Sequence, residues 1–353
     1  MPVEKLTPRE RWLAVLNHQI PDRVPMDYWA TSETSSRLIQ HMGTRTLREA
    51  LQILHVDFVI SPSPKYVGLP ISDDMDEYGI KYININYGTG VYREAASHPL
   101  ANYRSVDEIK KHYQFPSPDW YDYSNIADQI KGFENYPVCG GGSEPFLLYK
   151  ELRGYEQAFI DLTENPDIVH YILDHLFELA YQRTLRIIES LPPGTVTYCY
   201  VAEDLGGQTD LMISPRHIKE FLFPGMKRMI ALTHQAGAFV FHHDDGNCTR
   251  ILPDLIDLGI DLLNPIQWRA VGMDRKFLKD TYGDKLVFHG AVDNQHTLPF
   301  GSVQEVIEEV KDNITILGKG GGYILAPCHN IQPLTPIENI IAMYETGYKE
   351  GFY

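Results

Sequence analysis

The chain has 353 residues, of which 43% are hydrophobic and 22% are charged, and its formal net charge is −16 with His neutral. These proportions are those of an ordinary globular protein and exclude a disordered or fibrous chain. The excess of acidic residues disfavours nucleic acid as a partner. No run of about 18 apolar residues predicts a membrane span.

The cysteines give no sign of a disulfide framework. The four of them, Cys139, Cys199, Cys248 and Cys328, are far apart and form no C-x-x-C pair. Such spacing fits a reducing compartment. The opening MPVEKLTPRERW lacks the apolar stretch of a secretory signal. We therefore expect a cytoplasmic protein.

The first third of the chain predicts short helices and strands. A helix begins at Thr7 and runs to about His18, because Thr7 and Glu10 form a capping-box pattern. The next predicted elements are a strand ending near Asp27, helices over 34–42 and 46–54, and a strand over 57–62. The alternating Tyr, Ile and Asn residues of 78–92 then predict a β-hairpin, within an elaboration covering about 64–123.

Strands and helices alternate from residue 137 onward. The predicted strands are near-continuous apolar runs, which are typical of parallel strands buried on both faces: 137–141, 195–204, 238–245, 260–266, 286–293 and 322–330. The predicted helices cover 165–190, 214–237, 249–258, 274–282, 302–317 and 336–349. A doubly wound sheet and a closed barrel both have this order. Because no G-x-G-x-x-G follows the first strand, we predict an α/β fold, a single (β/α)8 TIM barrel domain over 1–353.

Polar residues follow the predicted strands at their carboxyl ends, where the sites of such barrels lie. They are Asp27 and Tyr28; Asp204 and Gln208; His243 and Asp245; Asn264 and Gln267; His289 and Asp293; and Cys328, His329 and Asn330. A single Asp after a strand is often only the cap of the next helix. Their repetition over five successive strands predicts a shared site.

The segment HHDDG carries the most specific signal. Since residues i and i+2 of a strand point the same way, His243 and Asp245 can face one pocket while His242 faces elsewhere. Two interpretations remain open. His243, Asp245 and His329, with Cys328 as a competing ligand, can hold zinc with one position open. Alternatively, Asp245 orients His243 in a metal-free acid–base pair.

Several segments resemble a known family. FHHDDGN, ILPDLIDLGIDLLNPIQ, HGAVDNQHTLPFG and GGGYILAPCHNIQPLTPIENI are similar to the uroporphyrinogen decarboxylase superfamily, which also contains corrinoid-dependent methyltransferases. LTPRERWLAVLNHQIPDRVP and EDLGGQTDLMISPRHIKEFLFP extend the resemblance, which is weakest over 64–136. It implies a (β/α)8 barrel with its site at the strand ends, and it allows a homodimer.

The resemblance also implies differences from two branches of the superfamily. The decarboxylases carry an Arg-rich segment after the first strand, of the form RQAGRYMPEY, whereas this chain has MDYWATSETSSR and no cation over 26–30. The thiol-methylating branch binds zinc through His-x-Cys and a later Cys. The matching positions here are Asp245 and His329, with Cys328 one residue earlier. This harder ligand set suits Lewis-acid chemistry at an oxygen or a water.

The chain thus resembles corrinoid-linked demethylating methyltransferases. We expect a methyl group to pass from a small methylated substrate, such as a methoxylated aromatic or a methylamine-like compound, to a corrinoid on a separate carrier protein. The expected catalytic residues are His243, Asp245, Asp204 and Asp293, and the expected substrate-binding residues are Asp27, Tyr28, Gln208, Asn264 and Gln267. The alternatives are a decarboxylase, that is a carboxy-lyase, and a non-catalytic binding barrel.

Overall fold

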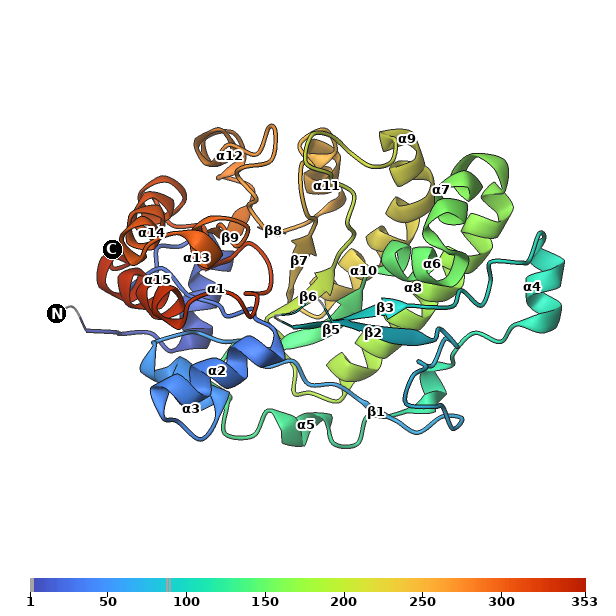
Figure 1. Ribbon diagram of the computed structural model, residues 1–353, viewed down its shortest axis with the longest axis horizontal. Helices are drawn as coiled ribbons and strands as arrows, with labels where there is room; N and C mark the ends of the chain where they lie inside the picture. The colour runs from blue at the N-terminus through green and yellow to red at the C-terminus, as the bar shows by residue number, and fades with distance from the viewer. Residues whose placement is uncertain (1–2, 87, 89) are drawn as a thin grey trace.

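A parallel sheet lies at the centre of the computed structural model, which describes residues 3–86, 88 and 90–353 (Figure 1). Six strands are hydrogen-bonded in chain order: β5 (Cys139–Ser143), β6 (Tyr198–Val201), β7 (Phe239–His243), β8 (Leu262–Asn264), β9 (Val287–Val292) and β10 (Tyr323–Pro327). Every residue of β8, β9 and β10 is buried. The continuous apolar runs of the sequence therefore lie between two covered faces, as parallel barrel strands require.

Two shorter extended segments connect the edges of this sheet. Met26 pairs in parallel with Leu325 of β10, and Ile60 pairs in parallel with Val138 beside β5. The two segments meet where the Asp57 amide donates to the Met26 carbonyl at 2.7 Å. The predicted (β/α)8 barrel is confirmed, and its first two strands are reduced to single bridges.

Helices surround the barrel, and one of them covers the end at which the strands begin. The first three are α1 (Pro8–Leu16), α2 (Ser32–Met42) and α3 (Leu47–Ile53), and α1 begins at the predicted Thr7–Glu10 capping box. Trp12 of α1 is fully buried and packs with Tyr198, Phe241 and other inward residues of the strands. Because α1 closes the amino-terminal end of the barrel, the carboxyl ends of the strands are left to form the open mouth.

The later helices alternate with the strands, and the first and last units of the chain lie side by side (Figure 1). They are α8 (Pro166–Glu189), α9 (Pro215–His217), α10 (Phe223–Gln235), α11 (Leu252–Leu258), α12 (Arg275–Tyr282), α13 (Thr297–Phe300), α14 (Val303–Leu317) and α15 (Ile337–Glu350). Within the described residues, no helix is both long enough and apolar enough to cross a membrane.

The segment between the second and third barrel strands is the predicted elaboration. It contains the antiparallel hairpin of β2 (Tyr82–Asn86) and β3 (Val91–Ala95), with Tyr82 opposite Ala95. Its other elements are β1 (Lys65–Tyr66), α4 (Val106–His112), η1 (Pro118–Trp120), β4 (Tyr121–Asp122) and α5 (Ile126–Gln129). Tyr92 of β3 reaches the cavity at the barrel mouth, so the hairpin contributes to the wall of that cavity.

The structure differs from the sequence prediction in two helical regions. The single helix predicted over 214–237 is interrupted by a π-helical turn, η2 (Ile218–Leu222), between α9 and α10. Pro224 follows this turn and has no amide hydrogen with which to continue the helical ladder. In addition, α6 (Pro145–Arg153) and α7 (Tyr155–Glu164) were not predicted. They follow β5, which extends to Ser143 rather than ending at Gly141.

Candidate active site

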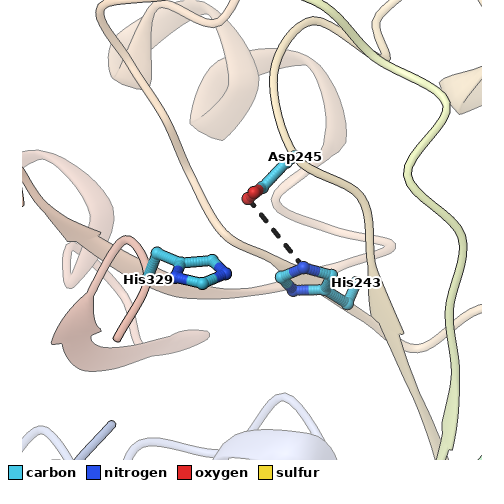
Figure 2. A group of neighbouring side chains, drawn as sticks. All are labelled: His243, Asp245 and His329. Carbon is cyan, nitrogen blue, oxygen red and sulfur yellow. Dashed lines mark ion pairs between the residues drawn. The ribbon is translucent and has the colours of Figure 1, made fainter. Parts of the chain in front are cut away.

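Three side chains from two separate strand ends meet at the barrel mouth (Figure 2). His243 is the last residue of β7, Asp245 lies two residues beyond it, and His329 lies two residues beyond β10. One ligand atom from each falls within 4.8 Å of the others. The Nε2 atom of His243 is 3.9 Å from the Oδ1 atom of Asp245. The curvature of the barrel thus brings His329 next to His243 and Asp245, which lie 84 or more positions earlier in the sequence.

This cluster borders a cavity of about 440 Å³. Its aromatic wall consists of Trp29, Tyr92, Tyr155 and Tyr200, and its polar wall consists of Glu144, Lys150, Asp204, His243, His329 and Asn330. A second cavity of about 700 Å³ shares Trp29 and Tyr200 with the first and extends along the first two barrel segments. The mouth therefore contains a compartment with ionisable walls and an adjoining larger one.

A buried chain of hydrogen bonds fixes His243 from behind. Its Nδ1 atom lies 2.6 Å from Asn264 Oδ1, and the Asn264 amide nitrogen lies 2.7 Å from His289 Nδ1. The Nε2 atom of His289 lies 3.1 Å from Asp27 Oδ2. We refer to Asp27, His289 and Asn264 as the relay. These residues are 2%, 0% and 0% exposed, respectively.

The relay determines which nitrogen of each imidazole carries hydrogen. Since the Asp27 carboxylate can only accept, His289 donates from Nε2, and its Nδ1 accepts from the Asn264 amide. The Asn264 carbonyl then accepts from the Nδ1–H group of His243. The Nε2 lone pair of His243 is consequently directed into the cavity, where it can bind a metal or accept a proton.

Two of the predicted substrate-binding residues belong to this relay. Asn264 does not line the 440 Å³ cavity, and Asp27 lines only the adjoining one, where its Oδ2 atom also accepts from Trp29 Nε1 at 2.9 Å. Tyr28 lines the adjoining cavity as well, and its hydroxyl lies 3.1 Å from Ser35 Oγ. The structure therefore places Asp27 and Asn264 behind the site rather than on its surface.

Gln267 and Asp204 lie next to the cluster of His243, Asp245 and His329. Gln267 donates to Asp245 Oδ1 at 2.8 Å and accepts from the Gly246 amide at 2.8 Å, so it orients the carboxylate. Asp204 Oδ1 lies 3.6 Å from His243 Nε2 and has no hydrogen-bond partner among the described residues. Asp204 is therefore free to interact with a ligand in the cavity.

Three of the remaining predicted site residues line a cavity other than the 440 Å³ one. Asp293, Gln208 and Cys328 line a small cavity together with Arg269, which is paired with Asp293. Asp293 Oδ1 also accepts from the Gln295 amide at 2.8 Å, as a turn-capping carboxylate does. The Cys328 thiol donates to the Ile266 carbonyl at 3.3 Å, and burial raises its pKa. Neither Asp293 nor Cys328 belongs to the group of three ligand atoms formed by His243, Asp245 and His329.

Glu144 is a cavity residue that the sequence prediction missed. It directly follows β5, the glycine-rich strand that was predicted to end at Gly141. Applying the strand-end rule to the correct end of β5 would have found it. Burial, together with the nearby charge of Asp204, raises the pKa of Glu144 to about 7. A carboxylic acid that is partly protonated at neutral pH can donate a proton to a ligand.

Glu144→Gln should change how the stability of the protein depends on pH. The pKa of Glu144 rises from an ordinary value of 4.5 to about 7 in the folded protein. Between these values the folded state holds a proton that the unfolded state has lost, so stability falls as the pH rises through this range. Urea unfolding from pH 4.5 to 7.5 should show a smaller fall for Glu144→Gln. The variant of exposed Glu164, Glu164→Gln, should follow the wild-type curve, and an equal fall in all three proteins would contradict the assignment.

Comparison with known proteins decides the family. The profile of the uroporphyrinogen decarboxylase (URO-D) family matches residues 83–349. The chain belongs to this family. The URO-D resemblance of the sequence is thus confirmed, and it agrees with a barrel whose polar cluster lies at the strand ends.

Relatives of this URO-D family protein carry two kinds of name. It is 25% identical over 207 residues to "Methylcobamide:CoM methyltransferase MtaA" of Methanosarcina barkeri (strain Fusaro / DSM 804), covering 59% of this chain and 56% of that protein. The chain thus matches little more than half the length of that relative. It is 22% identical over 259 residues to "Uroporphyrinogen decarboxylase" of Anaeromyxobacter sp. (strain Fw109-5), covering 70% of this chain and 69% of that one.

A solved structure supports the architecture. A methyltransferase from Methanosarcina mazei superimposes with a TM-score of 0.68 at 20% identity, covering 98% of this chain and 99% of that one. This similarity bears on the fold alone. It shows that the barrel arrangement extends over nearly the whole chain.

Proposed function

We propose that this protein is a methyltransferase that moves a methyl group from a small methylated substrate to a corrinoid on a separate carrier protein. The observation that carries the proposal is the meeting of His243, Asp245 and His329 beside a cavity that also contains Glu144. Methyl ethers and similar compounds are poor electrophiles, so their leaving atom needs an acid. The site offers acids at the position where a substrate would lie.

The cluster fits a zinc ion in its donor chemistry. Two imidazole nitrogens and one carboxylate oxygen form a three-ligand set, which in zinc enzymes leaves one position open. The relay supports this fit, because it keeps the His243 Nε2 lone pair available. Bound by these residues, zinc would supply Lewis-acid polarisation of the substrate heteroatom.

The other residues have separate roles in this proposal. As the methyl group leaves the substrate, the electron pair of the broken bond stays on the heteroatom, and Glu144 donates a proton to it. Gln267 holds Asp245 through the 2.8 Å hydrogen bond, and the relay holds His243. Asp204, whose Oδ1 atom lies 3.6 Å from His243 Nε2 and has no hydrogen-bond partner among the described residues, binds the substrate.

The segment after the first barrel strand disfavours uroporphyrinogen as the substrate. A tetrapyrrole with many carboxylates needs several cations, whereas residues 26–30 contain none and Asp27 is engaged by His289 and Trp29. Lys150 is the one Lys or Arg among the described residues that line the 440 Å³ cavity. Methyl transfer is therefore the better interpretation of this mouth.

The cobalt absorption spectrum tests the proposal directly. Purified protein mixed with cob(I)alamin and a methylated substrate should convert the cobalt to its methylated form. The protein should catalyse the reverse change when methylcob(III)alamin is supplied together with the demethylated product, which accepts the methyl group. An absence of spectral change in both directions, together with formation of coproporphyrinogen from uroporphyrinogen, would instead establish the decarboxylase. Heat-denatured protein provides the baseline for both assays.

A further inference from the structure

Lys150 is a buried cation in the wall of the cavity. It lies on α6, is 5% exposed and borders the same 440 Å³ space as His243 and His329. Its Nζ atom lies 5.4 Å from the ring centroid of Phe146 and 5.7 Å from that of Tyr155. Among residues 3–86, 88 and 90–353, it has no hydrogen-bond or ion-pair partner for its ammonium group.

A cation in the wall of a largely buried cavity attracts an anionic ligand strongly, because its surroundings screen charge less than bulk water does. The carboxyl groups of Glu144, Glu151 and Glu203 lie near Lys150, but none of them forms an ion pair with it. Both oxygens of Glu203 accept from the Phe146 amide, and Glu151 accepts from Tyr82 at 3.2 Å. The charge of Lys150 is therefore available to an anion in the cavity.

Aromatic side chains line the cavity beside His243 and beside Lys150. The rings of Trp29 and Tyr200 are stacked on His243 at centroid distances of 5.9 and 5.8 Å, and Tyr155 lies beside Lys150. A flat apolar ring can pack against such surfaces. A cavity of about 440 Å³ has room for a compound with a single ring.

We propose that Lys150 binds the carboxylate of the substrate, and that the substrates are methylated aromatic carboxylates. The ring packs against Trp29, Tyr155 and Tyr200, and the methylated heteroatom faces His243. This inference rests on the proposed function, because it names the substrate class of the same site. A methylammonium compound is excluded from this position, since Lys150 would repel its positive charge.

Calorimetric titration of the full chain tests this inference without any corrinoid. The wild type should bind 4-methoxybenzoate at least about tenfold more tightly than uncharged 4-methoxybenzamide, because a charge-assisted contact is lost with the amide. Lys150→Met should abolish that preference, and Lys150→Arg should retain part of it. Lys227→Met, which removes an exposed lysine of α10, serves as the matched control and should bind like the wild type.

The outcomes are separable. Equal binding of the two ring compounds by the wild type, no binding of either, or an unchanged preference in Lys150→Met would overturn the role of Lys150. Acetate binding as tightly as 4-methoxybenzoate would overturn the aromatic part of the proposal. If carboxylate binding depends on Lys150 but no methyl group is transferred to cobalt, the proposed function is wrong and the role of Lys150 in binding an anion is confirmed. Circular dichroism of each variant confirms that it is folded.

Discussion

Replacing His243 with alanine should leave the purified protein without stoichiometric zinc and should lower the rate of methyl transfer by more than about 100-fold. His243 supplies one of three ligand atoms within 4.8 Å of one another. Loss of residues that only support a ligand already costs about 10- to 100-fold in metal affinity or activity, so loss of a ligand itself should cost more. Elemental analysis and the cobalt spectrum measure the two effects separately.

The matched control is His41→Ala, which removes an exposed imidazole at the end of α2. It should keep both zinc and activity. If the wild type is fully active while holding no zinc after incubation with the metal, the acid–base interpretation of His243 and Asp245 replaces the zinc interpretation. If His243→Ala is as active as the wild type, both the zinc interpretation and the acid–base interpretation of His243 are wrong.

Replacing Asn264 with leucine should destabilise the protein by about 2 to 4 kcal/mol, although Asn264 makes no contact with the cavity. The substitution leaves the Nδ1–H group of His243 and the Nδ1 acceptor of His289 without partners in a buried position. Each unsatisfied buried group costs about 1 to 3 kcal/mol. Zinc affinity should also fall by about 10- to 100-fold, because His243 is no longer held in one tautomer.

Urea unfolding and competitive zinc titration measure the two consequences of Asn264→Leu. Asn135→Leu, at an exposed position, is the control and should change neither quantity. A loss of stability with unchanged zinc affinity would show that the relay only supports the fold. If neither the stability nor the zinc affinity of Asn264→Leu changes, the hydrogen bonds assigned to the relay are contradicted.

The segment after β5 changes the interpretation of the site more than any other region. Glu144 lies between β5 and α6, Lys150 lies six residues later on α6, and both line the cavity. The GGG run of 140–142 gives no apolar pattern that would reveal the true end of the strand. The two groups proposed to protonate the leaving atom and to bind the carboxylate were therefore outside the sequence prediction.

Local periodicity was sufficient to predict the barrel and part of its site. The apolar runs of β6 to β10 indicate strands buried on both faces, and parallel strands place their carboxyl ends at one mouth. The spacing of His243 and Asp245 places both on one side of β7. These features depend on neighbours in the chain, so the amino-acid pattern carries them.

The pairing of polar atoms depends on the register between strands, which no local pattern contains. His243 lies opposite Asn264, and Leu263 lies opposite Phe288, so Asn264 and His289 occupy the same row of the barrel. That row turns Asn264 into a support for His243 and connects it through His289 to Asp27. The surroundings of Lys150 on α6 likewise depend on the next helix, because its Nζ atom lies 5.7 Å from the ring centroid of Tyr155, the first residue of α7. Which side chains touch a substrate and which only hold others in place is therefore decided by contacts between segments distant in sequence.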